Sequence, residues 1–211
     1  MCRLLCVKSA QEFEISPLLE QLATISRESK EYQGHGWGCA WVEDGIWRYY
    51  HHIDPIWEHG LDDFGKTTLL LAHARSAFRD EGIVIENNMP FHDQRYAFIF
   101  NGELQGVRIK EQGRIGAEKI FNYIKRFDKG DMLTAMQRAI SVINKKTRYV
   151  RALNLVIADT KYAWLASEFN EDPDYFQMHK RESKDMKIVS SQPYPDESGW
   201  HAISNNIIEK V

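Results

Sequence analysis

The second residue of the chain is a cysteine, and it directly follows the methionine at position 1. Cysteine is small enough for removal of that methionine to be expected, which would leave Cys2 with a thiol and a free α-amine on one carbon. An α-amine titrates near pH ~8 and a free thiol near pH ~8.5, so the amine could accept the thiol's proton close to neutral pH. Such a residue combines a nucleophile with its own base. Alternatively, Cys2 begins a buried edge strand, since a free cysteine behaves as a small hydrophobic residue.

Two polar motifs follow predicted strands. The apolar run Thr67–Ala74 delivers His73-Ala74-Arg75 at its end, and the strand Tyr96–Phe100 is followed by Asn101-Gly102. A guanidinium fork suits a carboxylate ligand, although Arg75 could equally form a structural ion pair. Asn-Gly is also the strongest short signal for a hairpin turn, and a tight turn can expose its N–H groups. His73 is more typical of a hydrogen-bonded core histidine than of an acid or base.

The apolar patterns predict strands, then two adjacent helices, then strands. Ser16 as the cap and Pro17 in the first turn begin an earlier helix, and Asp131 caps the last one. Because a regular β-α-β alternation is absent, we expect an α+β domain with largely antiparallel sheets. A long surface loop is expected at Phe78–Gln94. The other predicted strands are Arg3–Val7, the hairpin Trp37–Val42 and Ile46–His52, Tyr149–Ala158, Ala163–Ser167, Tyr175–His179, Met186–Ser191 and Ile207–Val211, and a helix is predicted over Gly116–Phe127.

The composition excludes several classes of partner. The 211 residues carry a net charge of −3, so no basic excess exists to bind nucleic acid or a membrane surface. No apolar run approaches the ~20 residues that span a bilayer. Cys2, Cys6 and Cys39 form neither a disulfide nor a zinc framework, and the histidines show no ligand spacing. We therefore expect no metal, no cofactor, a reducing cytoplasmic location and one domain over residues 1–211.

At this point the sequence resembles the class II glutamine amidotransferases, which belong to the N-terminal-nucleophile hydrolases. The similarity is greatest to the small stand-alone branch of that family. No single tripeptide is specific, but the order and spacing of the motifs together are. The motifs are Cys2–Leu5, Gly36-Trp37-Gly38, Leu71–Arg75, Asn88-Met89-Pro90-Phe91, Asn101-Gly102, and Val189–Pro193 followed by Trp200.

The resemblance implies a four-layer αββα sandwich and hydrolysis of a γ-glutamyl amide. By this resemblance Cys2 is the nucleophile and its α-amine shuttles protons. The side-chain amide of Asn101 and the backbone N–H of Gly102 form the oxyanion hole. Arg75 holds the substrate's α-carboxylate, and His73 and Glu118 complete the expected substrate-binding residues. The implied small-molecule partner is glutamine or a γ-glutamyl compound. A separate ammonia-accepting synthase subunit and a homodimer are further expectations.

The sequence departs from the family pattern at the residues that recognise substrate. Gly116 stands where the family usually has the aspartate for the substrate's ammonium group, and Glu118 lies about 200° around a helix from it. Glu103 or Asp93 could substitute. Met89 and Phe100 also stand where histidine is common. These departures leave a second hypothesis open, a non-catalytic relative that binds an amino acid or a partner protein.

Overall fold

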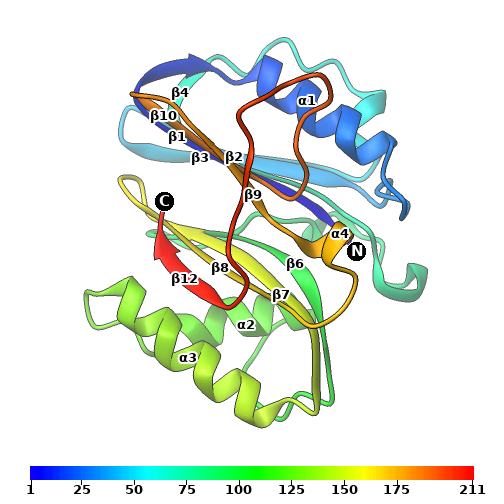
Figure 1. The fold of residues 1–211 in the computed structure, drawn as a ribbon, viewed down its shortest axis with the longest axis vertical. Coiled ribbons are helices and arrows are strands. Elements are labelled where there is room, and N and C mark those ends of the chain that lie inside the picture. The colour runs from blue at the N-terminus through cyan, green and yellow to red at the C-terminus, as the bar shows by residue number, and fades with distance from the viewer.

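Two antiparallel sheets lie face to face between helices in this computed structural model (Figure 1). The structure describes residues 1–211, except for the side chain of Asp80. Helix α1 (Ser16–Arg27) covers the outer face of the upper sheet, whereas α2 (Gly116–Lys125) and α3 (Met132–Lys146) cover the outer face of the lower sheet. This order of layers confirms the predicted α+β sandwich of αββα type.

Both sheets are built mainly from neighbouring antiparallel strands. The upper sheet has the order β11-β9-β10-β1-β4-β2-β3 and the lower sheet the order β12-β8-β7-β6-β5. The upper strands are β1 (Arg3–Glu14), β2 (Trp37–Glu43), β3 (Ile46–His52), β4 (Lys66–Ala74), β9 (His179–Glu182), β10 (Met186–Ser190) and β11 (His201–Ala202). The lower strands are β5 (Phe91–His92), β6 (Ala97–Gln105), β7 (Tyr149–Ala158), β8 (Ala163–Phe169) and β12 (Ile207–Lys210). The remaining helices are α4 (Pro173–Phe176) and the 3₁₀ turns η1 (Ile56–Glu58), η2 (Phe78–Asp80) and η3 (Ile85–Asn87).

Strand β1 connects the amino terminus to the core. It pairs with β4 on one side and β10 on the other, with Arg3 opposite Ala74. Its side chains alternate between two apolar clusters, as expected for a strand buried on both faces. Leu4 belongs to the cluster between the sheets, and Leu5 belongs to the cluster under α1. The strand thereby holds Cys2 at its own start, where the two sheets face each other.

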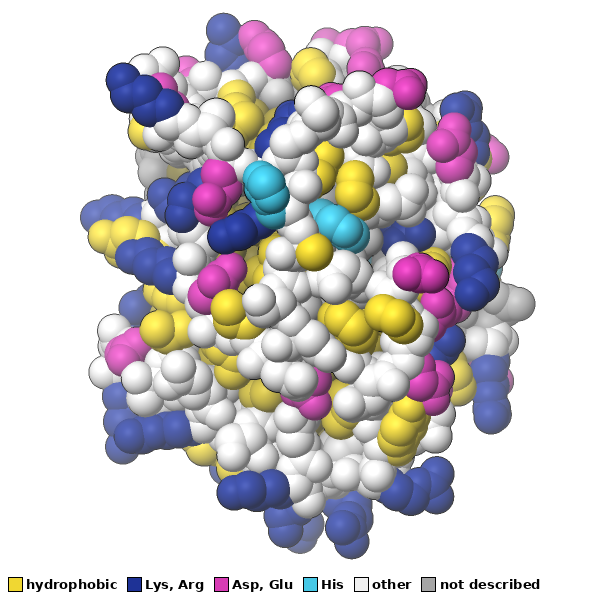
Figure 2. Space-filling model, viewed as in Figure 1, with side chains coloured by type: hydrophobic (Ala, Val, Ile, Leu, Met, Phe, Trp, Pro, Cys, Tyr) yellow, Lys and Arg dark blue, Asp and Glu magenta, His cyan; other side chains and the backbone are white. Residues whose placement is uncertain are grey.

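The helices follow the predicted apolar spacing. Ile120, Phe121 and Ile124 are the buried residues of α2 together with Ala117, and the side chain of Asp131 caps α3 by accepting a hydrogen bond from the Thr134 N–H. None of the helices in the described chain has the length and apolar character needed to cross a bilayer. On the face shown in Figure 2, acidic and basic side chains are interspersed above, and basic ones predominate at the lower end.

Three predicted elements differ from the observed ones. The predicted strand Tyr175–His179 is wrong, because α4 begins at Pro173 and the following strand is β9. A proline fits the first helical turn, since its missing N–H would be unpaired there. Ser16 is not the cap of α1: Ile15 occupies that position, and no side chain caps the helix. The predicted loop over residues 78–94 contains the short elements η2, η3 and β5.

Asn101-Gly102 does not form a hairpin turn. Both residues lie inside β6, where Asn101 is opposite Asn154 and Gly102 is opposite Leu153 of β7. A β-carbon on Gly102 would lie 2.2 Å from the Ala152 carbonyl oxygen. The glycine therefore permits close approach of two strands, which is its other common use in a sheet.

Candidate active site

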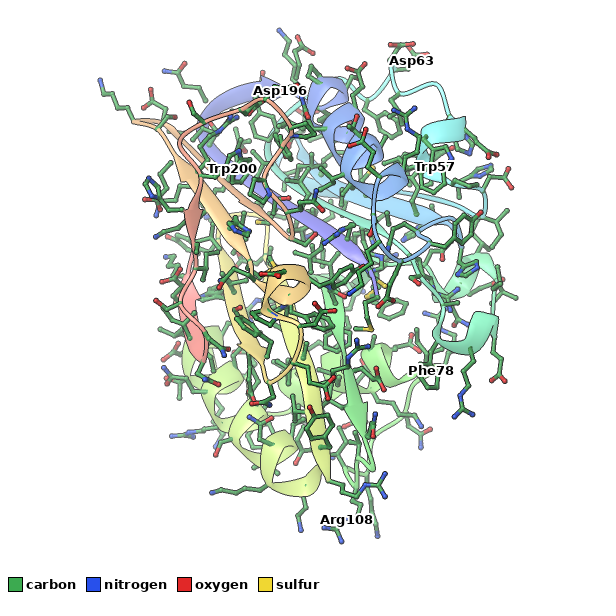
Figure 3. The ribbon with its side chains drawn as sticks, turned by 45° about the vertical axis from the view of Figure 1, so that its right-hand side comes forward. Trp57, Asp63, Phe78, Arg108, Asp196 and Trp200 are labelled. Atoms are coloured by element: carbon green, nitrogen blue, oxygen red, sulfur yellow. The ribbon has the colours of Figure 1, made fainter. Side chains whose placement is uncertain are left out.

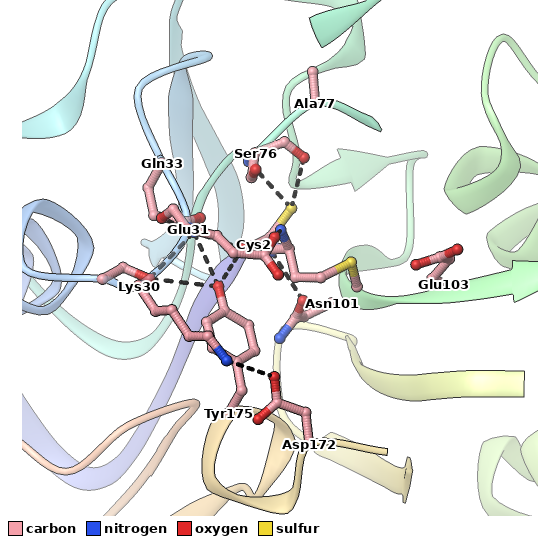
Figure 4. A network of polar contacts seen from close by, with 12 residues as sticks. Cys2, Lys30, Glu31, Gln33, Ser76, Ala77, Asn101, Glu103, Asp172 and Tyr175 are labelled. Atoms are coloured by element: carbon pink, nitrogen blue, oxygen red, sulfur yellow. Dashed lines mark hydrogen bonds and ion pairs between the residues drawn. The ribbon is translucent and has the colours of Figure 1, made fainter. Parts of the chain in front are cut away.

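Cys2 lies where the two sheets meet, in contact with both. Its backbone N–H donates to Oδ1 of Asn101 on β6, at 2.9 Å. The thiol contacts Ser76, the second residue after β4: the Ser76 N–H donates to Sγ at 3.4 Å, and Sγ donates to the Ser76 carbonyl at 3.6 Å (Figure 4). The chain then leads outward to Phe78, which is 64% exposed (Figure 3). The Cys2 nitrogen thus lies beside Asn101 and its sulfur beside Ser76, and the catalytic role of Cys2 with Asn101 stays a prediction.

The surroundings of the Cys2 thiol act on its pKa in both directions. Burial is the largest influence and leaves that pKa raised, with a smaller contribution from Glu31, while the chain's terminal ammonium group, the Ser76 N–H and the Arg75 guanidinium act in the opposite direction. The other two cysteines are free and fully buried. Burial raises the pKa of Cys6 to about 12 and that of Cys39 further. Cys2 is the one of the three that is not fully buried, so it is the one that a substrate could reach.

Asn101 presents a hydrogen-bond donor without a partner. The residue is fully buried, and its Oδ1 accepts the Cys2 N–H. Its Nδ2 is buried and has no hydrogen-bond partner in the described chain. A buried donor without a partner costs about 1–3 kcal/mol. An anion bound against Nδ2 would satisfy this donor.

Arg75 is a buried cation without a counter-ion among the described side chains. Its backbone is fixed because its N–H donates to the Gly36 carbonyl and its own carbonyl accepts from His35. The residue is 5% exposed, Nη1 has no partner, and no ion pair is formed with any carboxylate of the described residues. The alternative of a structural ion pair is therefore wrong for this part of the chain. Burial lowers the pKa of Arg75 and the nearby Cys2 raises it. An unpaired buried charge is costly, so the guanidinium is suited to bind an anion.

His73 lies in the core between the sheets. It is fully buried in β4, and its Nε2 is 3.0 Å from the carbonyl oxygen of Phe100 on β6. Burial lowers the pKa of His73 to about 3, although the bond to Phe100 opposes that shift. A neutral ring that donates to Phe100 ties the two sheets together beneath Asn101. The structure gives His73 no surface for a substrate, and its predicted binding role stays a prediction.

The low pKa of His73 predicts a loss of stability in acid. In the unfolded chain the ring accepts a proton below pH ~6.5, whereas the buried ring stays neutral down to about pH 3. Protonation therefore favours unfolding between these values, by up to about 1.4 kcal/mol per pH unit. We expect urea-unfolding free energies to fall less steeply between pH 6.5 and 5 for His73→Gln, which keeps a donor for Phe100. Equal slopes for the two proteins would contradict this role.

Glu118 is not brought together with Cys2. Its carboxylate forms an ion pair with Arg114 at 2.6 Å, and the same arginine lowers the pKa of Glu118. Both residues line a cavity of about 590 Å³ with His51 and Asn88 among its other walls. None of the residues that contact Cys2 lines that cavity. Glu118 as a substrate ligand remains a prediction.

The comparisons with known proteins bear on the fold. No protein-family model and no curated protein matches the chain. A glutamine aminotransferase class-II domain protein from Silicibacter pomeroyi superposes with a TM-score of 0.66 at 16% identity, over 97% of this chain and 92% of that chain. For a predicted glutamine amidotransferase from Pseudomonas aeruginosa the TM-score is 0.62 at 16% identity, over 99% of this chain and 96% of that chain. For glutamine phosphoribosylpyrophosphate amidotransferase from B. subtilis it is 0.63 at 16% identity, over 90% of this chain and 42% of that chain. The chain has the fold of the class II glutamine amidotransferase domains.

The residues that the amidotransferase resemblance placed near a substrate's ammonium group now have defined surroundings. Gly116 is the first residue of α2, and a β-carbon there would meet no atom within 4 Å. The carboxylate of Asp93 forms an ion pair with the ammonium group of Lys125 at 2.8 Å. Glu103 pairs with Arg151 at 3.2 Å, and it lies two residues after Asn101 on the same strand. Glu103 therefore shares a face of β6 with Asn101, which favours it over Asp93 as a substitute carboxylate.

Gly116→Asp should be accepted by the amidotransferase fold and stabilise it. The new side chain has open space, removes a glycine from a helix and places a negative charge at the helix amino terminus, a gain of about 1 kcal/mol. We expect the melting temperature to rise by about 2–4 °C. Gly60→Asp is the matched control, since Gly60 also has open space but no helix follows it. If glutamine hydrolysis by Gly116→Asp is no better than by wild type, position 116 does not limit glutamine binding.

Several residues around Cys2 were not found by sequence reasoning. The ammonium group of Met1 forms an ion pair with Glu31. The Met1 carbonyl accepts hydrogen bonds from Nε2 of Gln33 and the hydroxyl of Tyr175, each at 2.5 Å. Figure 4 shows Glu31, Gln33 and Tyr175 on one side of Cys2 and Ser76 on another. No local pattern marks these residues, because Glu31 and Gln33 lie in a polar stretch and Tyr175 is distant in sequence.

Two histidines and an aspartate lie closer together in the fold than their spacing in the sequence indicated. Ligand-type atoms of His52, Asp54 and His59 all lie within 4.8 Å of one another. The two rings contact each other directly, with His59 Nε2 at 2.7 Å from His52 Nδ1. Neither ring has a hydrogen bond to Cys2, Asn101 or Arg75 among the described contacts. The expected absence of a metal stays a prediction.

Proposed function

We propose that this protein is an amidohydrolase of the glutamine amidotransferase type that cleaves γ-glutamyl amides with Cys2 as its nucleophile. The observation that carries the proposal is the contact between Cys2 and Asn101. It brings the backbone nitrogen of Cys2 to Oδ1 of a buried amide whose Nδ2 has no partner among the described residues, which supports a nucleophile and an oxyanion donor in one site. Arg75, which forms no ion pair with a described carboxylate, would supply a cation for the substrate's α-carboxylate. We further propose one catalytic domain over residues 1–211.

The mechanism follows from the groups around the sulfur. The free α-amine of Cys2 takes the thiol proton, and the thiolate sulfur attacks the γ-carbonyl carbon. Asn101 Nδ2 and the Gly102 N–H hold the resulting oxyanion. The C–N bond then breaks, the α-ammonium group gives its proton to the leaving nitrogen, and a thioester remains. The amine next deprotonates a water that attacks the thioester, which releases the γ-carboxylate and restores the thiol.

This mechanism requires removal of Met1. While Met1 is attached, the nitrogen of Cys2 is an amide and cannot act as a base. Removal converts that nitrogen into an amine, which keeps Oδ1 of Asn101 as its hydrogen-bond acceptor. The proton shuttle and the oxyanion donor would then be held by the same asparagine side chain.

The proposal extends to partners and location. If ammonia is transferred rather than released, a separate synthase chain must accept it. Otherwise the protein is a plain hydrolase. Three free cysteines fit a reducing compartment, and we propose the cytoplasm. A second candidate, a binding protein without catalysis, is favoured by Gly116, which provides no carboxylate for a substrate's ammonium group.

Labelling of Cys2 tests the proposed function against the second candidate. Intact mass should show loss of Met1, and a glutamine-analogue diazo-ketone should then add once, at Cys2. Cys6 and Cys39 are internal controls, because both are buried and burial raises the pKa of each thiol. A retained Met1, or a processed protein that does not label, would support the binding protein instead.

A further inference from the structure

Met1 lies in an enclosed site next to Cys2. The ammonium group of Met1 pairs with Glu31, its carbonyl accepts from Gln33 and Tyr175, and its side chain packs on an apolar cluster. The methionine is only 11% exposed. We call this the residue-1 pocket; it is formed by Glu31, Gln33 and Tyr175, with an apolar side made by the cluster of Ala152, Phe169, Tyr175 and Phe176 on which Met1 packs.

The polar walls of the residue-1 pocket are held in place by contacts outside it. Gln33 is fully buried, and its Oε1 has no partner among the described residues. The Tyr175 ring lies under the Arg3 guanidinium at 4.3 Å. Burial raises the pKa of Tyr175, so its hydroxyl keeps its proton at neutral pH. The pocket therefore offers a carboxylate, two hydrogen-bond donors and an apolar wall.

The proposed reaction directs part of the substrate into this space. The α-amine of Cys2 must hand a proton to the leaving nitrogen, so the two nitrogens come within about 3 Å of each other. One side of the Cys2 nitrogen is already occupied by Oδ1 of Asn101 at 2.9 Å. Another is bonded to Met1 until that residue is removed. Of the two positions that then remain on the amine, the one that Met1 leaves opens into the enclosed site, and we place the substituent of the leaving nitrogen there.

We propose that the residue-1 pocket, once Met1 is removed, binds the substituent of the leaving amine. The proposal rests on the proposed function and names its substrate class: γ-glutamyl amides of alkyl amines that carry a second, cationic amine. The alkyl chain packs against the apolar side of the pocket. The second ammonium group pairs with Glu31, where the Met1 ammonium group lies in the precursor. The reaction is the acyl transfer described above, with the diamine as the leaving group and glutamate as the other product. Hydrolysis of glutamine would not use the residue-1 pocket, because the leaving group of glutamine is ammonia, which carries no substituent.

Matched amides test this assignment on the wild-type protein. The γ-glutamyl amides of 1,2-diaminoethane and 1,4-diaminobutane are compared with those of propylamine and pentylamine, which replace the ammonium group by a methyl group. Because a hydrogen bond to a charged group contributes about 1.5–3 kcal/mol, we expect kcat/KM to be at least about 10-fold higher for the better diamine than for its neutral match. Equal values within both pairs would overturn the proposal without any variant.

Glu31→Gln then assigns the preference to one residue. This variant keeps the shape of the side chain and removes its charge, so the ratio of kcat/KM between the matched amides should fall to about 1. Glu28→Gln is the control, since Glu28 is exposed at the end of α1, and it should keep the wild-type ratio. An unchanged ratio in Glu31→Gln would overturn the assignment to the residue-1 pocket. If no amide is cleaved and Cys2 does not label, the proposed function itself has failed; cleavage without the cationic preference contradicts only the pocket.

Discussion

Cys2→Ala is expected to abolish hydrolysis of γ-glutamyl amides, with kcat reduced by about 10⁴-fold or more. The reason is that no other thiol can replace the one beside Asn101: Cys6 and Cys39 are both fully buried. Alanine is also small enough for Met1 removal, so the variant keeps the free amine and loses only the sulfur. Single-turnover and steady-state rates on a panel of γ-glutamyl amides, together with diazo-ketone labelling, measure the effect.

Cys39→Ala is the control for this experiment. It removes a buried thiol from the cluster under α1, so it should lower stability and leave labelling of Cys2 intact. Hydrolysis that survives in Cys2→Ala would show that the activity belongs to another group or another protein. The assignment of Cys2 as the nucleophile would then be wrong.

Asn101→Ala is expected to lower kcat by about 100-fold or more with little change in KM. A donor fixed on the developing oxyanion contributes about 3–4 kcal/mol to the transition state and little to the bound substrate. The buried, unpaired Nδ2 is the atom suited to that task. Steady-state kinetics on the best amide of the panel separate kcat from KM.

Asn101 has two functions in the proposed site, and a second variant separates them. Its Oδ1 accepts from the nitrogen of Cys2, and its Nδ2 is the donor. Asn101→Asp keeps an acceptor for that nitrogen but removes the donor, so it should lose as much kcat as Asn101→Ala. If Asn101→Asp retains most of the activity, the side chain positions Cys2 and does not stabilise an oxyanion.

The sequence indicated the fold and the centre of the site more fully than the surrounding residues. Apolar spacing predicted α2 and α3, because a helix that covers a sheet buries one regular stripe. The motif resemblance grouped Cys2 with Asn101, and in the structure the backbone nitrogen of Cys2 lies 2.9 Å from Oδ1 of Asn101; the catalytic roles of the two residues stay a prediction. The same Asn-Gly pair also carried a local signal for a turn, which is wrong because the glycine allows close approach of β7.

The residue-1 pocket could not be predicted, for a physical reason. Glu31 and Gln33 follow α1, whereas Tyr175 belongs to α4. Their contacts depend on how β1 lies between β4 and β10, two strands that are far apart in the sequence, and apolar periodicity carries no information about such pairings. Tyr175 was in addition placed in a strand, because its neighbourhood is rich in aromatic residues.

Because Met1 is enclosed in the folded chain, the order of its removal and of folding matters. In the folded chain the terminal ammonium group is paired with Glu31 and the methionine side chain is only 11% exposed, so an aminopeptidase would have to open these contacts to reach it. Strand β1 gains its partner β10 only when residues 186–190 exist, about 10–40 s after synthesis begins at ordinary translation rates. On the proposed mechanism that interval is when the methionine must be cleaved. On that mechanism, a chain that folds with Met1 in place keeps an amide at the Cys2 nitrogen and lacks the base that the reaction needs.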